Sequence, residues 1–322
     1  MTYSAGGLIQ ATDYNGFVST TSGANVNDLW STGSGDKGWG QSALATVSAA
    51  GTVTATQWAS LVNTIASMGS QTNTSITSRA APTAGTLISV LSAVNTDLTN
   101  ITTNRNNAVA IGSQNTGWTG TNSKTSATSG ASWTITFTNT VTFASANAAR
   151  YFFNGGGLIK LDVSKTATGA LGDPEWNDLA NTLCGDIYFS GVGTSHTISG
   201  TAYTGTTKIG GTGTPGVLST SIGYHSLTPG AAATVIYKQF ADTAPYTLNY
   251  IQHTAALSAA STVLTFTTTW VAVDGDAISG GTAASGATPG TAPCTICTYY
   301  PPSATYLTSA SWGTPTVAAT TA

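Results

Sequence analysis

Asn154 and the three glycines that follow it form the part of this sequence that most resembles a ligand-binding loop. A phosphate-binding loop would carry a Gly-Lys-Ser or Gly-Lys-Thr step, and a dinucleotide site would have glycines that open a helix after a strand. These glycines instead precede LIKLDV at 158–163, whose alternation is typical of a strand. We therefore predict a tight structural turn between strands at 150–153 and 157–163, in which glycine supplies backbone angles that other residues avoid.

Three carboxylates lie close together in the sequence at Asp173, Glu175 and Asp178. Glycoside hydrolysis requires two carboxyl groups that face each other across the substrate. Asp173 and Glu175, however, stand at the predicted start of a helix, where acidic side chains favour the helix dipole. The DGD segment at 274–276 could offer oxygen ligands to calcium, but it lacks the further acidic ligands of an EF-hand loop and is interpreted as a turn. The carboxylates therefore predict neither a catalytic pair nor a metal site.

Cys294 and Cys297 form the single CxxC spacing of the chain. Zinc sites normally have four ligands, and no second ligand pair accompanies these cysteines in their Gly/Thr/Pro-rich segment, so we expect plain loop thiols or a local disulfide. The three histidines, His196, His225 and His253, lie in or beside predicted strands and are expected to be ordinary surface or core residues. No GxSxG nucleophile elbow is present. The sequence thus predicts no catalytic, cofactor-binding or metal-binding residue, and we expect a protein that is not an enzyme.

The composition is that of a folded chain with very few charges. Only 7% of the residues are charged, against about 25% in ordinary soluble proteins. The chain is nevertheless 40% hydrophobic, with eight Trp and twelve Tyr, which is unlike a disordered protein. The basic residues are scattered, so binding to nucleic acid by phosphate neutralisation is not expected. A net charge of only −3 favours association, and we infer that much of the surface is buried in an assembly.

Neither membrane insertion nor export is expected. No apolar stretch of about 18 residues is present, so the sequence predicts no membrane span. The first ten residues, MTYSAGGLIQ, lack the basic start and the apolar run of a signal peptide. We therefore expect synthesis in a cytoplasm without export by that route.

A gapless internal repeat organises the first hundred residues. IQATDYNGFV begins at Ile9 and VTATQWASLV begins at Val53, a period of 44 residues. Each copy predicts a helix start, with Thr12 or Thr56 as the N-cap. The aligned pairs place an aromatic and two apolar residues on one helix face: Tyr14 with Trp58, Phe17 with Leu61, and Val18 with Val62. A longer amphipathic helix is predicted at 86–101.

From Ala131 onward the period changes to two, which indicates strands. Besides the segment at 131–143 and the two strands beside the glycine turn, we predict strands at 186–190, 217–224, 233–240, 246–255 and 261–273. One helix is predicted at 173–185, with Asp173 as N-cap, Pro174 in the first turn and Gly185 as C-cap. The fold class is therefore α+β, with a small helical N-terminal region followed by a mainly antiparallel β-sandwich-like domain.

The predicted organisation has four parts: a helical region at 1–103, a polar linker at 104–130, a β-rich domain at 131–276 and a Gly/Thr/Pro-rich extended tail at 277–322. Exposed Trp and Tyr side chains, among which we expect Trp118, Tyr299 and Tyr300, could stack on sugar rings at a host surface. Most aromatic side chains are nevertheless expected in the core or at subunit interfaces.

Four short patterns together resemble a family of tailed-bacteriophage virion structural proteins that is frequent in cyanophages and other environmental phages. ARYFFNGGGLIKLDVS at 149–164 is the most specific of them, and the family usually has Tyr where this chain has Trp39. The residues that carry the resemblance are Asp13, Tyr14 and Asn15; Trp39, Gly40 and Gln41; Gln57 with Trp58; and Arg150, Tyr151, Phe152, Phe153, Asn154, Gly156 and Gly157.

The resemblance implies a virion structural protein without catalytic residues, located on the phage particle. We expect a fibre or whisker-like appendage of the tail or neck that self-assembles, with a homotrimer favoured, and contacts other virion proteins through helix faces and sheet edges. The alternatives are a capsid decoration or cement protein, a receptor- or glycan-binding module, and a fibre-borne depolymerase. No cofactor, nucleic acid or membrane is expected as a partner.

Overall fold

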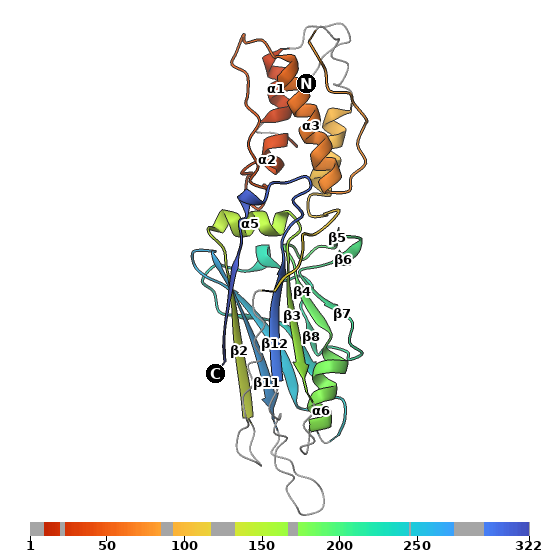
Figure 1. Cartoon of the computed structure of the whole chain (residues 1–322), viewed down its shortest axis with the longest axis vertical. Coiled ribbons are helices and arrows are strands. Elements are labelled where there is room, and N and C mark those ends of the chain that lie inside the picture. The colour runs from red at the N-terminus through yellow and green to blue at the C-terminus, as the bar shows by residue number, and fades with distance from the viewer. Residues whose placement is uncertain are drawn as a thin grey trace, which may run out of the picture.

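The computed structural model describes residues 10–19, 23–84, 93–116, 133–166, 173–244, 246–273 and 293–321. The chain is elongated, with helices at one end and a β-sandwich at the other (Figure 1). Helix α5 (Ala146–Asn154) lies across the end of the sandwich that meets the helices. The mixed α+β class with antiparallel sheets is confirmed.

The helical region consists of α1 (Ala11–Val18), α2 (Val26–Trp30), α3 (Ala55–Gln71) and α4 (Val94–Thr103). Both repeat copies form the predicted helix starts, and they pack on each other: the rings of Tyr14 and Trp58 meet edge to face with centroids 5.4 Å apart. The part of the predicted 86–101 helix before residue 93 lies outside the described residues, and α4 buries Val94, Leu98 and Ile101 as expected.

The predicted N-caps of the repeat helices were wrong by two residues. Helix α3 is capped by Thr54, whose hydroxyl accepts from the Gln57 amide while the Gln57 side chain accepts from the Thr54 amide. This reciprocal capping box satisfies two helix-end donors, whereas Thr56 alone could satisfy one. Helix α1 begins in the same way after Gln10, so Thr12 lies inside its first turn.

Two antiparallel sheets face each other. The first has the order β1-β12-β3-β4-β7 and the second the order β13-β2-β11-β10-β9-β8. The strands of the first are β1 (Asn115–Thr116), β12 (Pro293–Tyr300), β3 (Leu158–Lys165), β4 (Asp186–Phe189) and β7 (Thr206–Ile209). Those of the second are β13 (Thr316–Thr321), β2 (Trp133–Thr142), β11 (Val263–Ala272), β10 (Tyr250–Leu257), β9 (Thr234–Phe240) and β8 (Val217–Leu218).

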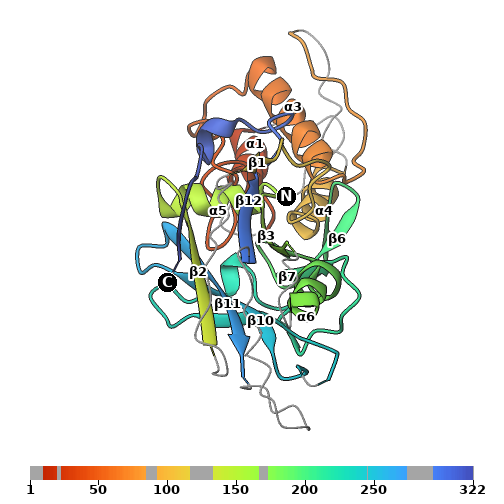
Figure 2. The same ribbon diagram turned by 60° about the horizontal axis from the view of Figure 1, so that its bottom comes forward.

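The inward side chains of both sheets form the sandwich core, since residues alternate between faces along a strand. Phe189 on β4 and Phe266 on β11 meet edge to face with centroids 5.2 Å apart, which joins the two sheets. A separate hairpin, β5 (His196–Ile198) and β6 (Thr201–Tyr203), covers a small second cluster around Leu158 on the outer side of the first sheet. Figure 2 shows the same arrangement with the bottom of the sandwich turned toward the viewer.

The strand predicted at 150–153 was wrong, because these residues lie in α5. The hydroxyl of Ser145 accepts from the Ala148 amide at 3.0 Å and caps a helix whose first turn is rich in alanine. The aromatic residues 151–153 are all buried, and tertiary packing of this amphipathic helix outweighs their strand propensity. The glycine turn therefore joins a helix to β3, and the strand predicted at 157–163 is confirmed.

Smaller differences concern strand lengths. Only Val217–Leu218 of the predicted 217–224 strand pairs, and Tyr224–Ser226 forms a short 3-10 turn. Strand β10 begins at Tyr250 rather than at residue 246. The helix predicted at 173–185 is confirmed as α6 (Asp173–Asp178) continued by a π-helical turn (Leu179–Cys184), and it ends at Gly185 with φ +72°.

The described parts of the expected linker and tail belong to the fold. Ala108 donates its amide to the Thr197 carbonyl and accepts from the Ser199 amide, so residues 104–114 are held against β5 rather than left as a linker. Strand β12 pairs with β3 along its whole length in the first sheet, and β13 pairs with β2 in the second. The threonines and prolines in and around β12 led to the prediction of a tail. Its residues Thr295, Cys297 and Tyr299 are nevertheless buried on one face, and Thr298 is buried on the other.

Candidate functional site at the junction of the helical region and the sandwich

Asn154, the last residue of α5, is a hydrogen-bonding centre between the two halves of the molecule. Its amide nitrogen donates to the carbonyls of Asp36 at 2.7 Å and Gly38 at 2.9 Å. Its own backbone carbonyl accepts from the indole nitrogen of Trp39 at 2.9 Å. The glycine loop (residues 31–41) is thus fastened to the end of α5 by three bonds, although more than a hundred residues separate them in the chain.

The side chain of His225 completes the Asn154 site from the sandwich. Its Nε2 lies 2.8 Å from Asn154 Oδ1. Because both amide hydrogens of Asn154 are donated elsewhere, Oδ1 must accept, which places the proton of the neutral imidazole on Nε2. Burial lowers the pKa of His225 to about 4, although Asp36 nearby acts in the opposite direction. The ring is therefore neutral near pH 7, and a histidine with so low a pKa is a poor general base there.

Arg150 holds the other side of the glycine loop. Its guanidinium donates to the carbonyls of Gly35 at 2.6 Å and Thr32 at 2.8 Å, and to Asn147 Oδ1 at 3.0 Å. The guanidinium also lies 5.3 Å from the centre of the Tyr151 ring. One charged side chain therefore satisfies two loop carbonyls, and these contacts leave it a structural rather than a catalytic cation.

Gln41 ties the glycine loop to a third segment, residues 308–311 just before β13. Its Oε1 accepts from the backbone amide of Thr308 at 2.8 Å and from its hydroxyl at 2.9 Å, and its Nε2 donates to Ser311 Oγ at 3.1 Å. Gly40 has φ +70°, and a Cβ there would lie 2.3 Å from the Tyr151 ring. Glycine is therefore required by both backbone angle and space.

The remaining residues of the resemblance lie inside the helical region and have structural contacts of their own. The Asn15 side chain pairs with the backbone of Val47 in both directions, donating to its carbonyl at 2.7 Å and accepting from its amide at 2.8 Å. Asp13 accepts from the Gln10 amide at 2.9 Å at the start of α1. Gln57 completes the α3 capping box, and Tyr14 and Trp58 form the aromatic pair described above.

Gly156 and Gly157 let the chain turn tightly from α5 into β3. Gly156 has φ +94°, and a Cβ there would lie 2.5 Å from the Ala108 side chain. A Cβ on Gly157 would lie 2.5 Å from the Phe152 ring. The structural turn predicted from the sequence is thus correct for the glycines, and the junction joins four segments: the glycine loop, α5 with its turn, residues 224–225 and residues 308–311.

A cavity of about 380 Å³ borders this junction, lined among others by Asp36, Asn147, Arg150, Tyr224 and His225. The Asp36 carboxylate is paired with Arg105 at 3.2 Å, and Arg150 is held by the loop carbonyls. These charged groups of the lining are thus engaged in contacts within the protein. The chemistry that this geometry performs is fastening of one segment to another.

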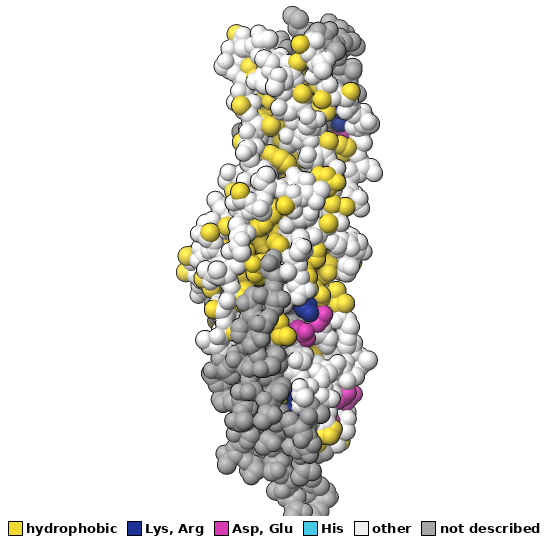
Figure 3. All heavy atoms as spheres, viewed as in Figure 1, with side chains coloured by type: hydrophobic (Ala, Val, Ile, Leu, Met, Phe, Trp, Pro, Cys, Tyr) yellow, Lys and Arg dark blue, Asp and Glu magenta, His cyan; other side chains and the backbone are white. Residues whose placement is uncertain are grey.

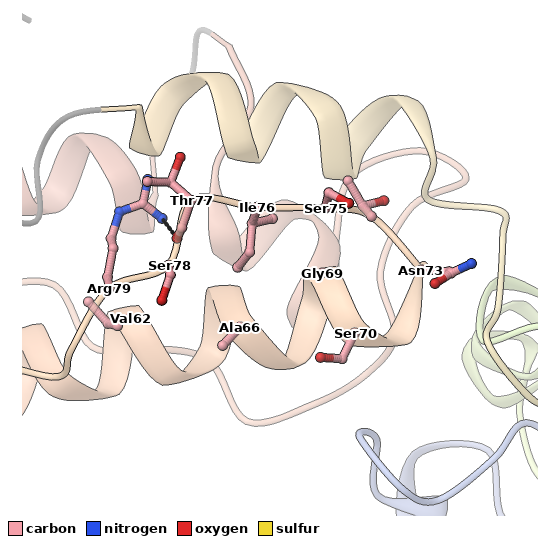
Figure 4. A pocket seen from close by; sticks show the side chains of 11 residues that line it. Val62, Ala66, Gly69, Ser70, Asn73, Ser75, Ile76, Thr77, Ser78 and Arg79 are labelled. Atoms are coloured by element: carbon pink, nitrogen blue, oxygen red, sulfur yellow. Dashed lines mark hydrogen bonds between the residues drawn. The ribbon is translucent and has the colours of Figure 1, made fainter.

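A second groove, of about 460 Å³, lies in the helical region between α3 and residues 73–79. Figure 4 shows Val62, Ala66 and Ser70 of α3 along one side and the segment from Asn73 to Arg79 along the other. Arg79 forms a buried ion pair with Asp97. Apart from the Asn73 amide, the rest of the lining is small, apolar or hydroxylated.

The other candidate residues are dispersed. Glu175 is buried in α6, and burial raises the pKa of its carboxyl, with Asp242 and Asp178 adding to the effect. His253 is buried against Tyr237, and burial lowers its pKa to about 3. Trp118 and the 274–276 segment lie outside the described residues, as does the side chain of Asp173. In the part of the chain that the structure describes, no group of three or more His, Cys, Asp or Glu side chains could hold a metal ion.

The prediction that Cys294 and Cys297 lie in a loop was wrong. PCTIC lies within β12 and not in a loop, and Cys297 is a buried free thiol whose pKa burial raises to about 12. Cys184 is likewise buried and free. Among the described residues, no helix is both long and apolar enough to cross a membrane.

One cluster that sequence reasoning missed lies on the outer face of the first sheet. The Tyr188 ring lies 5.5 Å from Tyr203 and 6.3 Å from Tyr300 between centroids. Beside them the Lys160 ammonium is 3.6 Å from Asp162 and 3.5 Å from Asp186. Figure 3 shows one face of the molecule, on which few of the described side chains are charged. Alternation along the predicted strands at 157–163 and 186–190 was the signal that could have placed these residues together.

Of the aromatic residues expected to be exposed, Tyr300 is half-buried in this cluster, whereas Tyr299 is buried on the inward face of β12 and was wrongly expected at the surface. Comparison of the whole chain with protein-family models, with curated proteins and with solved structures finds no match.

Proposed function

We propose that this chain is a structural protein of a tailed-phage virion, an appendage of the tail or neck that acts by self-assembly and attachment to the particle. The observation that carries the proposal is that residues of the resemblance form structural hydrogen bonds between distant segments. Trp39, Gln41, Arg150 and Asn154 fasten the glycine loop to α5 and to residues 308–311. The hydrogen bonds of Arg150 are exposed, and those of the other three residues are buried or half-buried. Because these residues fix segments of the fold to one another, they support a mechanical role over a catalytic one.

The surface chemistry supports the same proposal. A chain with 7% charged residues and a net charge of −3 has little electrostatic repulsion between copies. Uncharged surface can be buried in an assembly without the desolvation cost of a buried charge. A homo-oligomer, with a trimer favoured, is the assembly that we propose.

The test is to locate the protein on particles of a phage that encodes it. Mass spectrometry of gradient-purified virions is expected to detect the chain, and gold-labelled antibody is expected to mark the tail or neck. A label confined to the head would overturn the appendage assignment in favour of a capsid decoration protein. Absence of the chain from infectious particles would overturn the virion role altogether.

A glycan-binding module is the second candidate, favoured by the cluster of Tyr188, Tyr203 and Tyr300 beside Asp162 and Asp186. Tyrosine rings stack on the apolar faces of sugars, and the two half-exposed carboxylates can accept from sugar hydroxyls. Binding on a glycan array that is lost in Tyr300→Ala, but kept in Tyr306→Ala at an exposed position elsewhere, would support this candidate. An array without any binding would count against it.

A further inference from the structure

The outer face of the second sheet is an uncharged array dominated by threonine. Buried and outward residues alternate along β11 and β10, and the outward residues of the neighbouring strands follow from the pairing register. We name this surface the threonine face. It consists of Thr316, Ala318 and Thr320 on β13; Thr134, Thr136, Thr138, Thr140 and Thr142 on β2; Val263, Thr265, Thr267, Thr269 and Val271 on β11; and Tyr250, Gln252, Thr254 and Ala256 on β10.

The threonines are aligned across the strands. Thr320, Thr138, Thr267 and Thr254 form one continuous row over four strands. Rows on either side pair Thr140 with Thr265 and Thr136 with Thr269. Cross-strand threonine pairs stabilise a sheet modestly, but exposed strand positions also accept Lys and Glu, so pairing alone does not require the complete absence of charge.

The threonine face ends where charge begins. The next outward position beyond Gln252 is Lys238 on β9, whose ammonium lies 3.6 Å from the centre of the Tyr250 ring. None of the side chains of the threonine face itself is charged, and most are half-buried or exposed. In natural sheets, charged side chains at exposed surfaces and edges prevent association with other sheets. The threonine face, which runs to the edge strand β13, lacks this protection.

We propose that the threonine face binds the threonine face of a second copy of this chain, sheet against sheet. This inference rests on the proposed self-assembling role and names one surface that serves it. The two-fold contact pairs two copies, so it is separate from the three-fold contact that a trimer needs. A two-fold contact sets the residues near its axis beside their own copies, so a charge at the centre of the face would meet a like charge. On this face there is none, and hydroxyl groups that lose water can donate to and accept from one another.

Size and shape favour a second copy over other occupants. Four strands about 4.8 Å apart and about 33 Å long present roughly 600 Å² per copy, and a contact burying roughly 1,200 Å² in total reaches the range of specific interfaces. Neighbouring strands are rotated by about 20° because sheets twist. A flat binding partner, such as the face of a crystal, would therefore contact only part of the threonine face. A second copy has the same twist, and two such sheets pack with their strands about 30° apart.

The experiment measures the mass of the purified full chain by sedimentation equilibrium from about 1 to 100 µM, a range in which interfaces of this size commonly dissociate. The wild type is expected to form an oligomer in this range. Thr138→Lys and Thr267→Lys, at the centre of the face, are each expected to weaken association at least tenfold because they bury an ammonium beside its copy. Thr138→Val keeps the shape without charge and is expected to associate as the wild type does.

Thr197→Lys is the matched control, since Thr197 is an exposed strand threonine in the β5–β6 hairpin, away from this face. It is expected to leave association unchanged, and circular dichroism verifies that each variant is folded. A wild type that stays monomeric at 100 µM, or an oligomer that Thr138→Lys leaves intact, would overturn the proposal. Equal weakening by Thr197→Lys would do so too. A monomeric wild type would also contradict the proposed homo-oligomer, whereas an oligomer that Thr138→Lys leaves intact would contradict this surface alone. Neither result bears on whether virions contain the protein, which is tested separately.

Discussion

At the scale of single residues, asparagine side-chain amides fix backbone segments in place, a role that ion pairs often have in more charged proteins. Asn15 pairs with the backbone of Val47, Asn27 with that of Leu44 and Asn181 with that of Lys165, each side chain donating to the carbonyl and accepting from the amide of one residue. An asparagine side chain can imitate a neighbouring strand in this way, since it presents one donor and one acceptor side by side. A chain with few charges thereby fixes its irregular segments.

Asn154 is the residue whose chemistry is least replaceable. Asn154→Asp keeps the shape but replaces two donated hydrogen bonds by a carboxylate that faces the carbonyls of Asp36 and Gly38. We expect a loss of about 2–4 kcal/mol in unfolding free energy, since the new charge is buried against acceptors. Urea unfolding at pH 7 measures it. Asn147→Asp on the same helix, where the side chain accepts from Arg150, should change stability by less than about 0.5 kcal/mol; equal losses would contradict the argument.

His225 makes the junction sensitive to acid. Its pKa in the folded protein is about 4, whereas an unfolded histidine titrates near 6.5. The unfolded chain therefore takes up the proton first, and stability is lost as the pH falls from about 6.5 to about 4. His225→Gln can still donate to Asn154 but does not titrate.

Between pH 7.5 and pH 4.5, the fall in unfolding free energy should be smaller in His225→Gln by roughly 2–3 kcal/mol, at about 1.4 kcal/mol for each unit of pKa difference. Denaturant titrations at several pH values measure this difference. His196 and His253, whose pKa values burial also lowers, contribute to both proteins alike. Parallel pH profiles for the two proteins would show that the His225 ring does not change its protonation on unfolding.

At the scale of elements, the turn from α5 into β3 decides how the helical region meets the sandwich. Three backbone bonds close it, from the amides of residues 155–157 to the carbonyls of Tyr151, Phe153 and Phe152. Phe152 is fully buried and contacts Phe143, Phe153 and Tyr299. The turn thereby sets the aromatic face of α5 against the end of both sheets.

Gly157→Ala is expected to destabilise the protein by about 2–3 kcal/mol through overpacking, because the new methyl group would lie 2.5 Å from the Phe152 ring and 2.7 Å from its carbonyl oxygen. Gly200→Ala is the control: its φ is +79° but no atom lies within 4 Å of the added Cβ, so about 1 kcal/mol is expected from backbone strain alone. Thermal denaturation of both variants measures the difference. A loss in Gly157→Ala no greater than in the control would refute the steric argument.

At the scale of the whole molecule, one hydrophobic core runs from the helices into the sandwich. It includes Trp58 and Leu61 of α3, Trp39 of the glycine loop, Phe152 of α5 and Trp270 of β11. Helices and sandwich are therefore not separate units joined by a linker, and we expect them to unfold together.

Melting followed by far-ultraviolet dichroism, which reports helices and strands, should coincide with melting followed by tryptophan fluorescence in a single transition. Cys184 and Cys297 offer an independent probe, because burial raises both thiol pKa values to about 12. Peptide mapping after alkylation should find both modified only as the protein unfolds. Two resolved transitions, or modification of either thiol well below the melting temperature, would show that the parts open separately.

Local sequence patterns predict much of the fold. The 44-residue repeat between Ile9 and Val53 places Tyr14 and Trp58 on helix faces that do pack together. Period-two alternation located β2, β3, β4, β9 and β11, since a strand with one buried face must alternate. The C-cap at Gly185 followed from the left-handed backbone angle that glycine accepts.

What local patterns could not supply is the pairing of distant segments. The aromatic residues 151–153 favour a strand by propensity, and only the packing of α5 against both the glycine loop and the sheets makes them helical. Trp39, Gln41 and Asn154 carry the resemblance in the sequence, yet their roles depend on carbonyls and hydroxyls supplied by residues 36–38 and 308–311.

The sequence by itself determined the composition, the helix and strand periodicities, and the glycines that must turn. The tertiary structure alone decided that β12 pairs with β3 within a sheet, that the threonines of β2 and β11 stand in common rows, and that Trp39, Gln41, Arg150 and Asn154 meet at one junction. The physical reason is that periodicity is fixed by neighbours along the chain, whereas sheet register and side-chain hydrogen bonds between segments are selected by the packing of the whole core.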